Sequence, residues 1–194
     1  LDKKSIRFSV TCIPMAVFAV FSFLSAVASE YRSFCFSGSF EQFENVWVLM
    51  GYALMVYYVF LIVESEQEVQ YILYVLTAST IGLGLIGTGQ TFGFNFLETG
   101  IARAFIIPSD MDVTLSSKVG EHTAYMTLYN PNYVGVYVAM LFPLYVTLLL
   151  FARRAVDRIL YAVTVLLLLI SLYGSGSKAA FLVLAVEMFI LLVF

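Results

Sequence analysis

The chain has 194 residues, of which 61% are hydrophobic and 12% are charged, and its mean hydropathy is +0.94. Soluble domains contain about 45–50% apolar and about 25% charged residues, so this composition excludes a soluble globular domain and predicts an all-α, polytopic transmembrane helical bundle in a lipid bilayer. The net charge of −3 is divided between two aqueous sides and indicates no class of partner. One His and two Cys exclude a His/Cys-rich metal site within the chain, and neither a cofactor nor a nucleic-acid partner is expected.

Six apolar segments are the predicted membrane spans, and together they form a single transmembrane domain. They cover residues 8–28, 46–63, 69–88, 131–151, 159–173 and 178–194. The basic start of the first segment is also compatible with a signal peptide, but its apolar run is longer than usual for one, which favours a retained helix. Because the chain begins at Leu1 and ends inside an apolar run, we expect it to be a fragment of a longer protein.

The third span ends in Gly82-Leu-Gly84-Leu-Ile-Gly87, which fits the GxGxxG pattern of dinucleotide-binding folds. That pattern carries its meaning only after a strand and within a soluble βαβ unit, whereas here it ends an apolar segment. We therefore predict a packing role: Ala78 and Gly82 lie four residues apart and would allow another helix to approach closely.

The longest segment between spans covers residues 89–130 and is the predicted outer loop. Its second half contains Glu121 and His122, which are acid–base candidates, although a lone loop histidine is more often a solvated surface residue. Arg103 is placed to bind a phosphate in a bidentate manner, or to serve as an ordinary interfacial anchor.

Asn130 and Pro131 mark the start of the fourth span. Asn is a favoured N-cap because its side-chain oxygen accepts a free backbone N–H, and Pro at the next position has a suitable φ and no N–H to satisfy. The apolar run continues to Phe151, which is long enough to cross a bilayer.

Two basic clusters, at residues 3–7 and 153–158, predict the orientation of the chain. The positive-inside rule places both in the cytoplasm if the six spans alternate, so the N-terminus is expected inside and the 89–130 loop outside. The fourth and sixth helices would then both begin at the outer face. Helix N-termini present free N–H groups and a partial positive charge, which attract anions.

Lys178 is the main candidate for binding an anion, with Ser177 as the predicted N-cap of its helix. A lysine in a first turn is unfavourable by about 0.3–1 kcal/mol, which suggests an anionic partner such as phosphate. The fifth span, with about 15 residues, covers about 22 Å of a ~30 Å hydrocarbon core. Either Arg158 snorkels inward, or the 174–177 turn is recessed and Lys178 lines a pocket. The alternative for Lys178 is a snorkelling side chain at a helix end.

Glu187 lies deeper in the same predicted helix. An unpaired acid at the middle of a membrane costs about 2.5–3.5 kcal/mol. We therefore expect Glu187 to face the interior of the bundle and to be paired or protonated, although the sequence indicates no partner for it.

Two motifs together resemble a known family. Residues 129–135, Tyr-Asn-Pro-Asn-Tyr-Val-Gly, precede an apolar helix with Pro143, and residues 175–180, Ser-Gly-Ser-Lys-Ala-Ala, open the helix two spans later. This pair resembles the O-antigen ligase and O-antigen polymerase family, whose second motif is Ser-Arg-small. The resemblance covers about residues 80–194, and the Gln90-Thr-Phe-Gly stretch is a weaker match.

The resemblance implies a membrane glycosyltransferase of cell-surface polysaccharide and lipopolysaccharide assembly. Such a protein moves a glycan from a polyprenyl-diphosphate carrier to a glycan or lipid acceptor, at the outer face of the cell membrane, without a nucleotide sugar or a metal. The candidate diphosphate-binding residues of this chain are Lys178, Ser177, Asn130, Asn132 and Arg103, and whether Asn132 touches the substrate or only shapes the loop stays open. The chain departs from the family motif because Lys178 stands where Arg is usual, and lysine lacks the bidentate fork of arginine.

The catalytic acid–base residue of the family lies in a later loop, expected beyond Phe194, so His122 is not equated with it. A transporter or flippase of lipid-linked or anionic substrates is the alternative, and it predicts an internal repeat with paired, interrupted helices. A structural membrane subunit without chemistry is a third possibility, and it predicts no pocket near Lys178.

Overall fold

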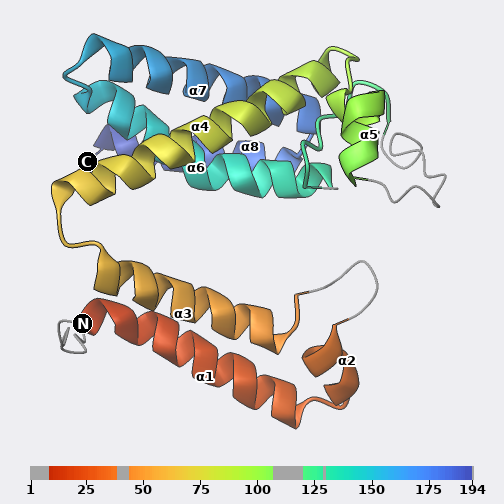
Figure 1. The fold of residues 1–194 in the computed structure, drawn as a ribbon, viewed down its shortest axis with the longest axis vertical. Helices are drawn as coiled ribbons and strands as arrows, with labels where there is room; N and C mark the ends of the chain where they lie inside the picture. The colour runs from red at the N-terminus through yellow and green to blue at the C-terminus, as the bar shows by residue number, and fades with distance from the viewer. Residues whose placement is uncertain (1–8, 39–43, 107–119, 129, 194) are drawn as a thin grey trace. The chain divides into compact units, whose positions relative to one another are not determined.

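The computed structural model describes residues 9–38, 44–106, 120–128 and 130–193, and every regular element within them is a helix (Figure 1). The all-α prediction is therefore confirmed for the described part of the chain. Two compact units, Leu1–Tyr71 and Ile72–Phe194, are described separately below.

Three helices are long and apolar enough to cross a membrane: α4 (Glu66–Thr91), α6 (Pro131–Phe151) and α7 (Ala155–Ser175). The other predicted spans form shorter apolar helices, namely α1 (Ile13–Ala28), α3 (Val46–Ile62) and α8 (Lys178–Val193), of 16 or 17 residues each. The chain is thus compatible with a membrane protein that has at least three spans, while the six-span arrangement and the cytoplasmic N-terminus stay predictions.

In the first unit, α1 and α3 lie side by side and antiparallel (Figure 1). A 3-10 turn, η1 (Val10–Cys12), precedes α1, and the short helix α2 (Arg32–Ser37) follows it. Three aromatic rings close one end of the hairpin: the ring centroid of Phe36 lies 6.2 Å from that of Phe23 and 5.7 Å from that of Trp47. Helix α3 begins cleanly because the Asn45 side chain accepts the backbone N–H groups of Trp47 and Val48.

Helix α4 begins with a capping box made by Ser65 and Glu68. The Glu68 carboxylate accepts the N–H groups of Glu64 and Ser65 at 2.7 and 2.9 Å, and the Ser65 hydroxyl accepts the Glu68 N–H at 3.3 Å. The acidic stretch before the third predicted span is therefore the helix start itself, where negative charge is favourable. Helix α4 is correspondingly longer at both ends than the predicted 69–88.

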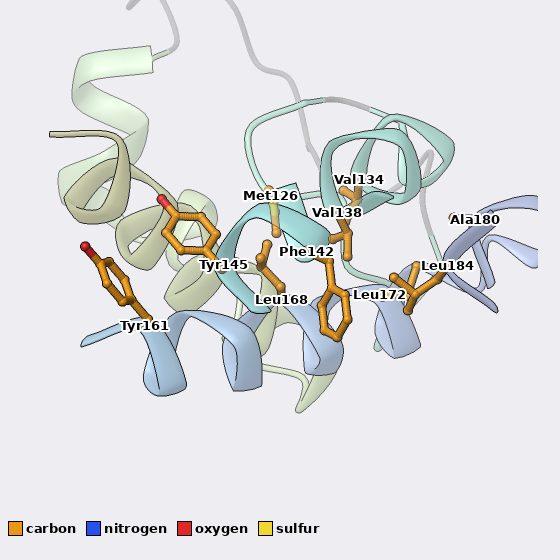
Figure 2. Close-up of a cluster of buried hydrophobic side chains, with 10 residues drawn as sticks. All are labelled: Met126, Val134, Val138, Phe142, Tyr145, Tyr161, Leu168, Leu172, Ala180 and Leu184. Carbon is orange, nitrogen blue, oxygen red and sulfur yellow. The ribbon is translucent and has the colours of Figure 1, made fainter. Parts of the chain in front are cut away.

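Helices α6, α7 and α8 form the core of the second unit. Helix α7 returns antiparallel to α6, and a left-handed Gly176, with φ of 63°, turns the chain into α8. The buried cluster draws on all three helices and on Met126 from the preceding loop (Figure 2). Its members are Met126, Val134, Val138, Phe142, Tyr145, Tyr161, Leu168, Leu172, Ala180 and Leu184.

Close packing of α4 against α7 depends on Gly84 and Gly87. A β-carbon at position 84 would come within 2.8 Å of the Leu167 Cβ, and one at 87 within 2.6 Å of the Ser171 hydroxyl oxygen. Nothing lies within 4 Å of the corresponding point at Gly82. The prediction that Ala78 and Gly82 form this contact is therefore wrong for Gly82, and the contact lies further along the helix.

Helix α7 corrects the prediction of a short fifth span. It has 21 residues instead of the predicted segment 159–173, and at about 1.5 Å per residue it covers about 31 Å. Asp157 lies in its first turn, where an acid is favourable, and accepts a hydrogen bond from the Tyr74 hydroxyl at 2.9 Å. The argument that a short span draws the 174–177 turn below the surface therefore does not hold.

The predicted outer loop, residues 89–130, contains regular structure of its own. Helix α4 extends into it as far as Thr91, and two short elements follow, η2 (Phe96–Glu98) and α5 (Gly100–Ile106). Residues 107–119 of this loop, and Tyr129 in the family-like motif, lie outside the described residues.

Candidate functional site

The first residues of α6 and α8 meet at one end of the second unit. A β-carbon at Gly135 would lie 2.6 Å from the Ser177 hydroxyl oxygen and 2.8 Å from the Ala180 Cβ, so the absence of a side chain at Gly135 allows this approach. Figure 1 shows that α6 and α8 run in the same direction. Their N-termini therefore lie next to one another, as predicted from topology.

Asn130 is the N-cap of α6, as the sequence predicts. Its side-chain oxygen accepts the backbone N–H of Asn132 at 2.9 Å, and Pro131 occupies the first helical position. Asn130 is thus engaged by its own helix, whereas the exposed side chain of Asn132 extends from the first turn.

A cavity of about 370 Å³ runs between α6 and α8 from these first turns. Asn132 and Ser177 line the cavity near the helix starts, and Glu187 lines it ten residues after Ser177 in the chain. Small and apolar side chains make up the rest of the wall: Val136, Ala139, Met140, Ala179, Ala180 and Val183, together with Gly135. One carboxylate oxygen of Glu187 is buried and has no hydrogen-bond partner among the described residues.

Lys178 is the first residue of α8, and its side chain is exposed. It does not line the α6–α8 cavity, and the choice between a recessed pocket and a snorkelling lysine at a helix end stays open. Ser177 immediately before it is buried at 6% exposure, and its backbone N–H donates to the Ser175 hydroxyl at 3.3 Å. Within the described part of the chain, no carboxylate forms an ion pair with the Lys178 ammonium.

Arg103 lies apart from these helix starts, in the short helix α5. It lines neither the α6–α8 cavity nor the loop cavity described next. The structure therefore brings together Asn130, Asn132 and Ser177, with Lys178 adjoining them in sequence, and leaves Arg103 outside the group.

A second cavity, of about 440 Å³, lies between the end of α4 and the residues that precede α6. We call it the loop cavity. Its lining combines aromatic, amide, carboxylate and imidazole groups, from Gln90, Phe92, Gly93, Asn95, Glu98, Gly120, Glu121, His122, Thr123 and Tyr125. Sequence analysis identified His122 and Glu121 as a pair but missed the rest, because residues 90–98 lie more than 20 positions before residues 120–125 in the chain.

Gln90 holds the two walls of the loop cavity together. Its side-chain oxygen accepts the backbone N–H groups of Tyr125 and Met126 at 2.9 and 2.7 Å, and its amide N–H donates to the Met126 carbonyl and the Asn95 side chain, both at 3.2 Å. Gln90 is 3% exposed, so these bonds form in a dry environment where an unmet polar group is costly. The segment after residue 120 is thereby fixed to α4.

Tyr125 directs a hydrogen-bond donor at this cavity. Its hydroxyl oxygen accepts the Asn95 amide N–H at 2.6 Å, and the structure describes no acceptor for the hydroxyl hydrogen. Burial raises the pKa of Tyr125 above its ordinary value of 10.0, the hydrogen bond from Asn95 lowers it, and the nearby Glu98 carboxylate raises it again. The hydroxyl is therefore protonated at neutral pH, as it already would be at its ordinary pKa, and is able to donate.

His122 has a fixed ring orientation. Its Nδ1 lies 3.3 Å from the carbonyl oxygen of Thr91, and since a carbonyl can only accept, Nδ1 carries the hydrogen and Nε2 is the acceptor of the neutral ring. The ring packs on Gly93, where a β-carbon would come within 2.8 Å of His122 Cε1. The backbone of His122 itself is left-handed, with φ of 65°, a conformation in which His is enriched among non-glycine residues.

The loop cavity lies at the same end of the unit as the N-termini of α6 and α8. The backbone N–H of Ala124 donates to the Gly174 carbonyl at 3.0 Å, near the last turn of α7 and four residues before Lys178. A side chain at Gly174 would collide with Thr91, so the end of α4 packs there as well.

No family model, curated protein or solved structure matches this chain. The class that the fold defines is accordingly broad: a protein that is all-helical in its described part, with three helices able to cross a membrane, a cavity between α6 and α8, and the loop cavity.

Proposed function

We propose that this chain is part of a membrane glycosyltransferase that transfers a glycan from a polyprenyl-diphosphate carrier to a glycan or lipid acceptor, as the resemblance to the O-antigen ligases and polymerases implies. The observation that supports it most is the meeting of two parallel helix N-termini at Gly135 and Ser177, next to an exposed Lys178. In this proposal the chain lies in the cell membrane with that end at the outer face.

The chemistry of such a site is electrostatic. Each helix N-terminus carries about half a positive charge and unpaired N–H groups, and two of them side by side reinforce one another. Lys178 adds a full positive charge next to them. A departing diphosphate gains negative charge as the glycosidic bond breaks, so groups that are already in place stabilise the transition state more than the ground state. Asn132 and Ser177 supply polar groups in the wall of the α6–α8 cavity, next to these helix starts.

The test is glycan transfer by the full-length protein carrying Lys178→Ala. We expect transfer from a polyprenyl-diphosphate glycan to fall about 100-fold or more, with normal protein levels, because one preorganised charge is lost. Lys178→Arg should keep most of the activity. Arg154→Ala is the matched control, since it removes one exposed cation at the other end of α7. Wild-type transfer by Lys178→Ala would overturn the role of Lys178.

The same protein, reconstituted in vesicles with a labelled polyprenyl-diphosphate glycan, separates the transferase from the transporter. Movement of the label between leaflets without formation of a new glycosidic bond would support a flippase. Helices α4, α6 and α7 run without interruption, whereas the transporter alternative predicts paired, broken helices.

A further inference from the structure

We propose that the loop cavity is a carbohydrate-binding site for a single uncharged pyranose unit. This inference concerns a cavity other than the α6–α8 site and does not depend on the proposed transfer reaction. It rests on four groups that face one hollow of about 440 Å³: an exposed ring, a fixed imidazole, a buried hydroxyl donor and carboxylates. A cavity of this size is within the range of small-ligand sites.

The hydrogen-bonding groups fit a ligand that both donates and accepts. The Tyr125 hydroxyl has a hydrogen to donate, because its oxygen is already occupied by Asn95. In its neutral form His122 offers Nε2 as an acceptor, because Nδ1 lies against the Thr91 carbonyl. Glu98 and Glu121 add carboxylate acceptors in the same lining. Sugar hydroxyls meet this requirement, since each one is a donor and an acceptor at once.

The aromatic group fits the apolar side of the same ligand. Phe92 lines the cavity and is 72% exposed, so most of its ring surface is free to contact a ligand. A pyranose has one face of C–H groups, which can pack on an aromatic ring while its hydroxyls reach the surrounding polar groups. Small-ligand sites commonly combine an apolar surface with a few placed polar groups in this way.

The charges in the cavity disfavour anionic ligands. The described lining contains Glu98 and Glu121 and no lysine or arginine, so a phosphate or another anion would be repelled. No group of three His, Cys, Asp or Glu side chains in the described part of the chain is arranged to hold a metal ion. A neutral, hydroxyl-rich ligand satisfies the carboxylates without a counter-ion.

The walls of the cavity are held before any ligand arrives. Gln90 bonds the backbone at Tyr125 and Met126, and Ala124 is bonded to Gly174 at the end of α7. The ligand therefore does not need to order this backbone, which lowers the entropic cost of binding.

The test is saturation-transfer NMR on the protein in phosphatidylcholine nanodiscs, because maltoside and glucoside detergents would compete for a sugar site. The probes are the methyl pyranosides of glucose, galactose and N-acetylglucosamine, with glucose 6-phosphate as the anionic counterpart. We expect transfer to at least one neutral glycoside and none to the phosphate. Absence of transfer to all three glycosides, or equal transfer to the phosphate, would overturn the proposal.

Two matched pairs of variants assign the signal to this cavity. Phe92→Leu should weaken binding about three- to tenfold, whereas Phe94→Leu, an exposed ring outside the lining, should not change it. Glu98→Gln should weaken binding about tenfold, whereas Glu66→Gln in the first turn of α4 should have no effect. Equal effects within either pair would place the sugar elsewhere.

Lys178→Ala separates this inference from the proposed function. The variant should bind the glycosides as the wild type does, even where glycan transfer is lost. Loss of glycoside binding in Lys178→Ala would contradict a separate loop site. Normal glycoside binding together with wild-type glycan transfer would overturn only the transferase role of Lys178.

Discussion

Gly135 lies so close to Ser177 that a β-carbon at position 135 would come within 2.6 Å of the serine hydroxyl oxygen. The contact joins the first turns of α6 and α8, so a methyl group there must push the two helices apart. We expect Gly135→Ala to lower the free energy of unfolding by about 1–3 kcal/mol, as overpacking of a close contact does. Thermal unfolding in nanodiscs, followed by circular dichroism, measures the change.

Gly82→Ala is the control for this prediction. Nothing lies within 4 Å of a β-carbon at position 82, and the residue is inside α4. Alanine should therefore be neutral or stabilise the helix by up to about 1 kcal/mol. Equal destabilisation by the two substitutions would mean that the contact with Ser177 does not govern the effect at Gly135.

Local signals in the sequence predicted the start of α6, and the structure agrees to the residue. Asn130 and Pro131 define the beginning of the helix by their own chemistry, and the hydrogen bond from the Asn132 N–H confirms the cap. The start of α4 carries a comparable signal in Ser65 and Glu68, a Ser-x-x-Glu capping box, but the predicted span begins only at residue 69.

The packing face of α4 could not be predicted in this way. In an apolar helix several faces are suitable for burial, so Gly82, Gly84 and Gly87 are equivalent until the partner helix is known. Contact with Leu167 and Ser171 of α7 selects Gly84 and Gly87. The loop cavity could not be predicted for a related reason: it is formed by segments that are distant in the sequence, since Gln90 and its partner Tyr125 are 35 residues apart.

Thr80 forms the main polar contact between α4 and α6. Its fully buried hydroxyl lies 3.1 Å from the Tyr137 hydroxyl and accepts a hydrogen bond from that of Tyr145 at 3.4 Å. Thr80→Val keeps the volume and removes these bonds. We expect the free energy of unfolding to fall by about 0.6–1.7 kcal/mol, the range of hydrogen bonds between membrane helices, as measured by thermal unfolding.

Thr77→Val provides the matched comparison. Thr77 is equally buried, at 2% exposure, but its hydroxyl donates only to the Leu73 carbonyl of its own helix. Such a back-bond adds little to stability, so the substitution should change it by less than about half of the Thr80 effect. The role of Thr80 as a contact between helices would be refuted by a larger loss at Thr77.

Gln90→Leu should release the segment after residue 120 from α4. The substitution leaves the N–H groups of Tyr125 and Met126 buried without their acceptor, at a cost of about 1–3 kcal/mol for each unmet group. We expect amide hydrogen exchange at these two residues to accelerate while the core of α6 and α7 keeps its protection.

Two further variants test whether the side-chain oxygen of Gln90 is the group that protects Tyr125 and Met126 from exchange. Gln90→Glu keeps an oxygen that accepts both N–H groups and should retain part of the protection. Gln67→Leu replaces an exposed glutamine near the start of α4 and should leave exchange at Tyr125 unchanged. If Gln90→Leu exchanges like the wild type, other contacts hold the segment in place.

Glu187 and Thr88 are the described residues that each have a buried side-chain oxygen without a hydrogen-bond partner. One of the Glu187 carboxylate oxygens is buried without a hydrogen-bond partner among the described residues, in a cavity whose wall is otherwise small and apolar at that depth. A carboxyl group in this position costs free energy and offers no contact in return. We therefore expect Glu187→Leu to raise the free energy of unfolding by about 1–3 kcal/mol.

Glu187→Gln separates the effect of polarity from that of shape. It keeps the size of the side chain and leaves a polar group unpaired, so it should recover less than half of the gain seen with leucine. Thermal unfolding of both variants in nanodiscs measures this. A loss of stability in Glu187→Leu would show that the carboxyl group has a partner in the folded protein. Glycan transfer lost in a variant that is more stable than the wild type would instead assign the carboxyl group to function, since natural proteins retain destabilising polar groups at working sites.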